Sequence, residues 1–438
     1  TFNNANLDGS GAGFGGTISA IASSNLNVDA LSNFITAGTG GAGNNVMTLS
    51  GNTVSLLGNF DASSTSGIGG LIDVDTNGSF TVGSGTANFD VSGAASNDGT
   101  IDITGSSIAT DANTNFGNAD LLLTSTNGNV SVSHDITSGD MTFVSQNTTG
   151  DINTAVGADL TSSGTITITG NDAITTNGNI TSTGNIALNA DNDASGVGNV
   201  LTIGTIASNG GDVTLRGDRS EVRNNITTSG GNITMAADLD GNGSGYFDLD
   251  NSAVLSTSGG NYVGTGAQAY LNQSSTINTA GGDITATTTT ADLDLDSSTF
   301  IGRNISFTSG DDVLTNASTV TASGTATFSA NNNVTLNGTY SSNGNFTINA
   351  DNNLNGAGHI QTNDAIATNG GNFIATGEIV ELQDDITTSG GSVTLTANRD
   401  GNTTGYYDLD NNAFISTSNG SFTAVSYTHL TLPTSFLV

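Results

Sequence analysis

The chain repeats one short pattern, a polar turn ending in glycine followed by alternating apolar and polar residues. Gly231-Asn-Ile-Thr-Met235 is a typical copy. Residues two apart share a face of a β-strand, so Ile233 and Met235 should point to one side and Thr234 to the other. No long segment places apolar residues at helical spacing, so the pattern predicts strands rather than helices. Further copies are Gly164-Thr-Ile-Thr-Ile168, Gly184-Asn-Ile-Ala-Leu188, Gly211-Asp-Val-Thr-Leu215 and Gly391-Ser-Val-Thr-Leu395.

The spacing of these copies indicates a stack of coils. Many neighbouring copies begin about 20 residues apart, the length of one solenoid coil. One such coil cannot bury its apolar face alone, whereas stacked coils bury it and pair each other's backbone groups. The sequence therefore predicts an all-β fold, a right-handed parallel β-helix (β-solenoid) of coils of about 20 residues. Antiparallel propellers and sandwiches remain the alternative, since they also use short strands separated by frequent turns.

A longer repeat overlies the short one. Gly184–Gly260 aligns with Gly344–Gly420 without a gap, with 38 identities in 77 positions. Such a match indicates duplication, and the offset between the two copies would be eight coils of about 20 residues each. We expect divergent coils over 1–136, a first long copy over 137–296 and a truncated second copy over 297–424.

Composition limits the function classes. The 438 residues include 61 Gly, one Pro and no Cys or Trp, and all five basic side chains are Arg. A formal net charge of -34 excludes simple binding to nucleic acid or to an anionic membrane, because like charges repel. The absence of Cys excludes disulfides and thiolate metal sites. No apolar run is long enough for a membrane-spanning helix, so we expect no membrane insertion.

The repeat stops after Ala424. Val425-Ser-Tyr-Thr-His-Leu-Thr-Leu-Pro433 has no partner in the first long copy and contains the single Pro. Residues 425–438 resemble a translated adaptor or vector sequence, and we expect them to be a non-native tail. The alternative is a genuine capping segment, which solenoid ends require.

The repeat units resemble those of filamentous haemagglutinin-type exoproteins. The resemblance lies in units such as Thr228-Ser-Gly-Gly-Asn-Ile-Thr-Met235 and Ser208-Asn-Gly-Gly-Asp-Val-Thr-Leu215, and as a pattern it covers most of 60–424. It implies a right-handed parallel β-helical shaft of a secreted or surface-exposed bacterial protein, exported through an outer-membrane transporter. The Asn-Pro motifs of the family's export domain are absent, so the resemblance implies a shaft and no catalytic residues.

An acidic, glycine-containing stretch is the best candidate for a cation site. Hard cations such as Ca²⁺ take oxygen ligands from tight loops, and the stretch starts like a calcium loop of the Asp-x-Asp-x-Asn-Gly kind. It lacks the Glu that an EF-hand requires, and Leu249 stands there instead. The alternative is a polar excursion whose Asp and Asn form turns. The predicted ligands are Asp238, Asp240, Asn242, Asp248 and Asp250 in the first copy and Asn398, Asp400, Asn402, Asp408 and Asp410 in the second.

Two other motifs carry weaker predictions. Arg216-Gly217-Asp218 is an integrin-type tripeptide, a candidate recognition site that also reads as an ordinary turn with local charge pairing. Asp292-Leu-Asp-Leu-Asp296 should place three carboxylates on one strand face, more as a solvated surface than as a metal site.

Three functions remain open. The repetition favours a structural shaft of an adhesin that projects a binding region toward a receptor or glycan on a host or neighbouring cell. A polysaccharide-acting β-helix enzyme is the first alternative, although isolated His134 and His359 and the lack of Cys give catalysis little support. A calcium-loaded surface-layer module is the second alternative.

Overall fold

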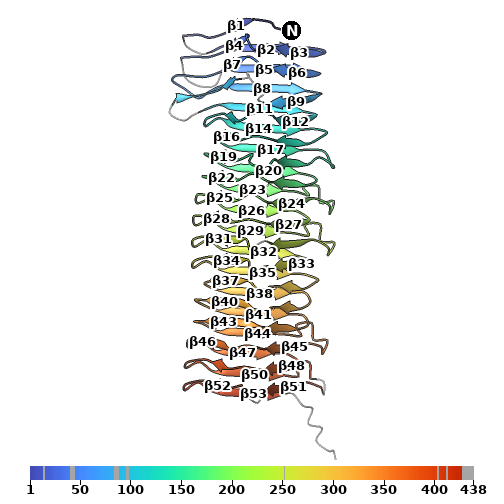
Figure 1. Ribbon diagram of the computed structural model, residues 1–438, viewed down its shortest axis with the longest axis vertical. Helices are drawn as coiled ribbons and strands as arrows, with labels where there is room; N and C mark the ends of the chain where they lie inside the picture. The colour runs from blue at the N-terminus through green and yellow to red at the C-terminus, as the bar shows by residue number, and fades with distance from the viewer. Residues whose placement is uncertain are drawn as a thin grey trace, which may run out of the picture. The chain divides into compact units, whose positions relative to one another are not determined.

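The molecule consists of parallel β-strands arranged in coils. The computed structural model describes residues 1–12, 15–39, 45–82, 88–94, 98–250, 252–401, 404–410 and 413–426. The chain divides into two compact units, Thr1–Asn242 and Gly243–Val438. Within each unit the coils lie one above the next, with a strand from each coil adding to the edge of each sheet (Figure 1). No helix occurs among the described residues, so none of them forms a helix that could cross a membrane.

Each full coil of the first unit contributes a strand to each of three sheets. The first sheet contains β2 (Thr17–Ile21), β5 (Val46–Gly51), β8 (Leu71–Thr76), β11 (Thr100–Gly105), β14 (Asp120–Ser125), β17 (Met141–Ser145), β20 (Ile166–Gly170), β23 (Ile186–Asn189), β26 (Val213–Arg216) and β29 (Ile233–Ala236). The second contains β9 (Ser79–Val82), β12 (Ser107–Thr110), β15 (Val130–Val132), β18 (Ile152–Thr154), β21 (Ile174–Thr176), β24 (Asn199–Thr202) and β27 (Arg219–Val222). The third contains β13 (Thr114–Asn115), β16 (Ile136–Ser138), β19 (Leu160–Ser162), β22 (Ile180–Ser182), β25 (Ile206–Ser208) and β28 (Ile226–Thr228).

The first coils of this unit pair their remaining strands separately. A two-stranded sheet joins β3 (Asn25–Val28) and β6 (Thr53–Leu56). A four-stranded sheet contains β1 (Asn6–Asp8), β4 (Asn33–Ile35), β7 (Asn59–Asp61) and β10 (Asn88–Asp90).

The second unit repeats the three-sheet arrangement. Its first sheet contains β32 (Tyr262–Gly266), β35 (Ile284–Thr288), β38 (Ile305–Ser309), β41 (Ala326–Ala330), β44 (Phe346–Asn349), β47 (Phe373–Thr376), β50 (Val393–Ala397) and β53 (Phe422–Ser426). Its second contains β30 (Tyr246–Leu249), β33 (Gln268–Leu271), β36 (Leu293–Asp294), β39 (Val313–Leu314), β42 (Val334–Leu336), β45 (His359–Thr362), β48 (Ile379–Leu382) and β51 (Tyr406–Leu409). Its third contains β31 (Val254–Ser256), β34 (Thr276–Asn278), β37 (Thr299–Gly302), β40 (Ser318–Ala322), β43 (Gly338–Ser342), β46 (Ile366–Thr368), β49 (Ile386–Thr387) and β52 (Ile415–Ser416).

The strand register confirms the predicted parallel β-solenoid. Ile186 pairs with Val213, which in turn pairs with Ile233, and both pairings are parallel. The coils are less uniform than the sequence pattern suggests, because side chains stacked in adjacent coils are 20, 27 or 29 residues apart. The offset between the two long copies therefore spans seven coils, from β23 to β44, rather than eight.

The interior is filled as the alternating pattern predicts. Ile233 and Met235 are fully buried, whereas Thr234 between them is part-exposed. Phenylalanines stacked in successive coils add a feature that the pattern did not indicate. In the second unit the Phe328 ring lies 5.4 Å from that of Phe346, which lies 6.1 Å from that of Phe373. Offset stacking of this kind adds to the stabilisation from apolar burial.

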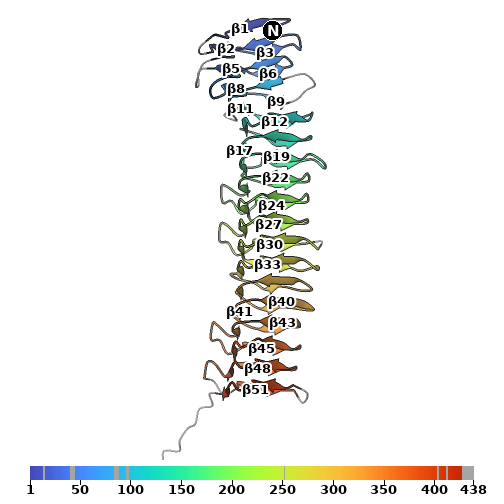
Figure 2. The same ribbon diagram turned by 90° about the vertical axis from the view of Figure 1, so that its left-hand side faces the viewer.

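The corners between the third sheet and the next coil explain the repeated Gly-Gly. Gly230 has a φ of 107°, which favours glycine, and a Cβ on Gly231 would lie 2.1 Å from the carbonyl oxygen of Gly211 in the coil before. A buried hydroxyl closes each such corner: Thr279 Oγ1 donates to the Gly282 carbonyl at 2.6 Å. Viewed from the side, the loops of each unit leave the coils at these and the other corners (Figure 2).

The repeat continues past Ala424, the end predicted from the sequence. Val425 and Ser426, the first residues of the expected tail, belong to β53, which pairs in parallel with β50. Residues 427–438 lie outside the described residues.

Candidate functional site

Long loops leave the first corner, which joins a first-sheet strand to the second-sheet strand of the same coil. Four of these loops start with an acidic or amide residue in the left-handed conformation. The residues are Asp191, Asp238, Asp351 and Asn398, with φ values of 51°, 56°, 57° and 57°. Asp and Asn tolerate this conformation better than most side chains, which explains why the duplicated loops keep them.

The predicted calcium ligands of the first copy fall into two groups. Asp238, Asp240 and Asn242 lie in the loop after β29, in the first unit. Asn242 donates from its backbone nitrogen and from Nδ2 to the Asp240 carboxylate, at 3.2 and 2.6 Å. Asp248 lies in β30 and Asp250 follows it, both in the second unit, where Asp248 pairs with Tyr270.

The second-copy ligands are likewise separated between a loop and a strand. Asn398 and Asp400 lie in the loop after β50, Asp408 lies in β51, Asp410 follows it, and Asn402 lies outside the described residues. Within the described part of the chain, only Asp292, Asp311 and Asp312 bring three carboxylate oxygens within 4.8 Å of one another, so no three of the predicted carboxylates do. The loop-and-strand ligand set therefore stays a prediction without an assembled geometry.

The structure instead stacks buried acidic residues at the first corner. Asn189 pairs with Arg216 and Arg216 with Ala236, so Asp191, Asp218 and Asp238 stand at one position in successive coils. Asp191 and Asp218 are 2% and 5% exposed. Asp193 and Asp240 follow in the two loops, and a Cβ on Gly196 would lie 2.6 Å from Asp240 Oδ2, so these loops touch. We call the set Asp191, Asp193, Asp218, Asp238 and Asp240 the Asp191 corner.

The second unit contains the matched set from the second long copy. Asn349 pairs with Thr376 and Thr376 with Thr396, which stacks Asp351, Glu378 and Asn398 at the equivalent position. All three are at most 2% exposed. We call the set Asp351, Asn353, Glu378, Asn398 and Asp400 the Asp351 corner.

The buried acids are only partly satisfied by hydrogen bonds. Asp191 Oδ1 accepts from the backbone nitrogens of Ser195 and Gly196 at 2.7 and 3.0 Å, while its Oδ2 is buried without a hydrogen-bond partner. Asp351 Oδ2 and Asp218 Oδ1 are in the same condition. A buried polar atom without a partner is costly, so these oxygens mark sites where a ligand would be stabilising.

Burial at this corner also determines how accessible the Arg-Gly-Asp tripeptide is. Arg216 is exposed at the end of β26, but Gly217 and Asp218 are buried. Burial raises the pKa of the Asp218 carboxyl; Arg219 lowers this pKa, and Asp240, Asp191 and Asp238 raise it. Because its carboxylate is buried, the tripeptide is not presented for recognition in this conformation.

A cavity of about 220 Å³ opens beside Asp191. Its walls are Asn189, Ala190, Asp191, Asn192, Ala194, Arg216 and Leu239. In the second unit the residue matching Leu239 is Arg399, whose Nη1 donates to the Ala350 carbonyl at 2.9 Å and to Asn352 Oδ1 at 2.8 Å. Ala350 and Asn352 match Ala190 and Asn192, so a guanidinium occupies the equivalent space in the second copy.

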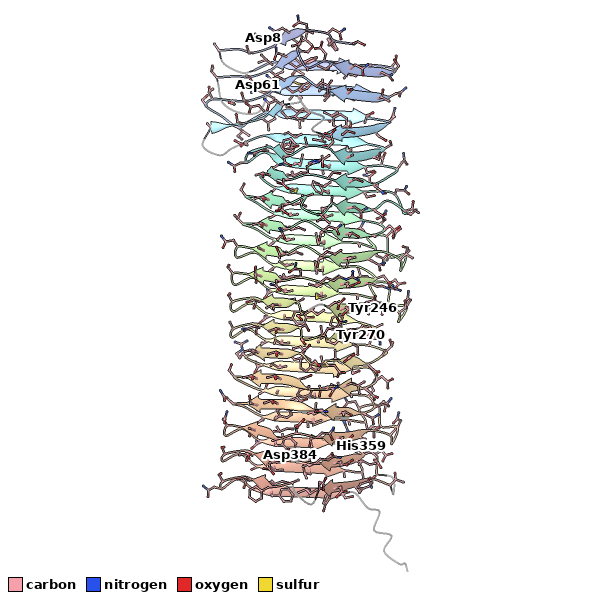
Figure 3. The ribbon with its side chains drawn as sticks, in the orientation of Figure 1. Asp8, Asp61, Tyr246, Tyr270, His359 and Asp384 are labelled. Atoms are coloured by element: carbon pink, nitrogen blue, oxygen red, sulfur yellow. The ribbon has the colours of Figure 1, made fainter. Side chains whose placement is uncertain are left out.

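A second acidic surface covers the second sheet of the second unit. Leu293 and Leu295 are buried, so Asp292, Asp294 and Asp296 share the outward face as predicted. Burial, with Asp312, Asp311 and Asp294 as neighbours, raises the pKa of Asp292, although a backbone hydrogen bond from Asp312 lowers it. Tyr246 and Tyr270 lie on neighbouring coils with their rings 5.6 Å apart, edge to face (Figure 3).

One uncharged hollow of about 410 Å³ lies along the third corner of the second unit. Its lining includes Ile301, Thr321, Ser341, Asn343 and Asn369. The hollow has a simple origin, because shorter turns after β37, β40 and β43 lie between longer Gly-Gly turns after β34 and β46.

Two of the three histidines lie among the described residues. His134 is exposed, and His359 Nε2 lies 3.0 Å from Glu381 Oε2 on the surface of the second sheet (Figure 3).

Among known proteins, no family model, no curated sequence and no solved structure matches the chain.

Sequence reasoning missed Asp191, Asp351 and Glu378 as members of a site. Their signal was present in the alignment of the two long copies, where an acidic residue recurs two positions after a strand in both. It could not be recognised without the register, which places residues of successive, unequal coils at one corner.

Proposed function

We propose that the chain is part of the structural shaft of a large secreted or surface-exposed bacterial adhesin, of the filamentous haemagglutinin type. The observation that carries this proposal is the unbroken parallel stacking of coils within each unit. A shaft needs this regularity because every coil must template the next and transmit force through its backbone hydrogen bonds.

The surface chemistry supports the same role. The chain has few charged side chains for its size, and those are mostly acidic. A surface of Asn, Ser, Thr and Gly avoids strong nonspecific attraction, and a negative net charge keeps neighbouring shafts apart. Such a shaft would be exported through an outer-membrane transporter and would carry a binding region toward a receptor or glycan on another cell.

Particle shape in solution tests this proposal. A shaft predicts that small-angle X-ray scattering of the full chain gives an elongated particle with a constant cross-section. A compact, nearly spherical scattering profile would contradict it.

Catalysis tests the proposal against its main alternative. We expect no product from a panel of neutral and acidic polysaccharides incubated with the chain. Turnover of any of them that disappears in Asp292→Asn would end the shaft as a complete account, because among the described residues only Asp292, Asp311 and Asp312 bring three carboxylate oxygens within 4.8 Å.

A further inference from the structure

The Asp191 corner carries more acidic residues than the duplicated Asp351 corner. Asp193 and Asp238 of the Asp191 corner are replaced by the amides Asn353 and Asn398 in the Asp351 corner. The first copy thus gathers five carboxylates where the second gathers three. Like charges at this density destabilise the folded state unless a cation neutralises them.

Each copy brings a basic side chain to its corner: Arg219 Nε lies 3.8 Å from Asp218 Oδ2 in the first copy, and Arg399 serves the second. Arg399 reaches back across two coils, and its guanidinium contacts the Ala350 carbonyl and Asn352 Oδ1. Thr376 is the small residue in the coil between, where the first copy has Arg216. The first copy has Leu239 in place of Arg399, and the cavity beside Asp191 remains.

Several residues of the cavity wall carry oxygen atoms suited to a metal ion. Asp191 is 2% exposed, lines the cavity, and has a buried Oδ2 without a hydrogen-bond partner. Ala190 and Asn192, also on the cavity wall, carry a backbone carbonyl and a side-chain amide. Asp218 is not part of the wall, but it stands at the same corner position in the next coil and has a buried Oδ1 without a hydrogen-bond partner. Carboxylate, carbonyl and amide oxygens are the ligands that Ca²⁺ prefers.

We infer that the Asp191 corner binds one divalent cation, Ca²⁺ by its donor chemistry, in the space that the Arg399 guanidinium fills in the second copy. Asp191 is the central ligand, and Ala190, Asn192 and Asp218 complete the oxygen set. The central ligand Asp191 lies two coils before the loop of the ligands predicted from sequence, of which Asp238 and Asp240 remain as nearby charges.

Arg216 sets the strength of this site. Its exposed side chain stands on the cavity wall and carries the same charge as the ion. Removing it in Arg216→Ala should therefore tighten Ca²⁺ binding several-fold.

Calorimetric titration of the metal-free full chain with CaCl₂ tests the inference. We expect Asp191→Asn to remove one equivalent of bound Ca²⁺, and the matched variant Asp351→Asn to leave it. The double variant Leu239→Arg with Arg216→Thr imports the arrangement of the second copy, so it should abolish that equivalent while raising the melting temperature in EDTA.

The outcomes separate clearly. Absence of Ca²⁺ binding by the natural chain, or equal loss in Asp191→Asn and Asp351→Asn, would overturn the inference. If Asp191→Asn does not fold, the double variant decides: Ca²⁺ affinity unchanged from the natural chain would refute the site, and loss of binding in a folded double variant supports it.

Discussion

At the scale of single residues, the direction in which a side chain points controls its contribution. Ile233 lies at the centre of a buried ladder, where it pairs with Val213 of the coil before, and neighbouring Thr234 pairs with Thr214 on the outside. The two positions have the same backbone environment, so they form a matched pair for testing the interior.

We predict that Ile233→Asp destabilises its coil by several kcal/mol, because it buries an unpaired charge. Thr234→Asp should change stability by less than about 1 kcal/mol. Circular dichroism during thermal unfolding measures both. Equal losses would mean that the inward face is assigned incorrectly.

Stacked aspartates give a second prediction at this scale. Asp73 in β8 pairs with Asp102 in β11, and burial, with Asp75 and Asp102 nearby, raises the pKa of Asp73 to about 6. Asp73 therefore stays protonated in the folded state up to about pH 6, whereas in the unfolded chain it loses its proton near the ordinary pKa of an aspartate. This contribution to stability is complete below pH 4 and is lost as the pH rises through 6.

Asp73→Asn should accordingly melt at a higher temperature than the natural chain at pH 7.5 and at about the same temperature near pH 4. Asp283→Asn is the control with the opposite sign, because hydrogen bonds from Arg303 lower the pKa of Asp283. The ionised carboxylate there stabilises the fold at pH 7.5. If the melting temperatures of all three proteins changed with pH in the same way between pH 4 and 7.5, this account would be contradicted.

At the scale of elements, the corners hold the coils in register. A Cβ on Gly231 would meet the Gly211 carbonyl, and the buried Thr279 hydroxyl donates to the Gly282 carbonyl. Neither contact follows from strand pairing alone, and both repeat from coil to coil. These contacts hold the corner in a specific conformation, so it is more than a loose connection between strands.

Thr279→Val keeps the side-chain shape but removes the hydroxyl, so we predict a loss of about 0.5–1.5 kcal/mol from one lost hydrogen bond. The Gly282 carbonyl keeps the hydrogen bond that it accepts from the Arg303 backbone nitrogen at 2.7 Å. Thr285→Val, on the outward face of β35, should have little effect. Differential scanning calorimetry of the two variants provides the comparison. A larger loss in Thr285→Val than in Thr279→Val would show that the hydroxyl does not hold the corner.

The sequence pattern predicted the elements better than it predicted the site. Period-two alternation identifies inward residues such as Ile233, and Gly-Gly marks the corners, because both follow from strand geometry. Coil length varies with corner loops, so which residues meet across coils could not be counted in advance. Asp191 and Asp218 are distant in the sequence, and only the register brings them to one corner.

At the scale of the whole molecule, a net charge of -34 must weaken each compact unit through self-repulsion. Burial raises the pKa of several carboxyls of the described residues, as for Asp102, Asp120 and Asp172, and neighbouring aspartates raise these values further. We predict that the melting temperature rises by several degrees between 10 mM and 500 mM NaCl, as salt screens the surface. A melting temperature that falls over this range would show that ion pairs outweigh repulsion.

The shaft proposal is tested most directly by lengthening the protein. Inserting a second copy of residues 184–343 adds one complete long repeat, which comprises seven coils. At about 4.8 Å per coil, electron microscopy of single particles should show an increase of about 34 Å in length with no change in width. Particles that grow in width, or that gain a separate globular mass, would contradict the account.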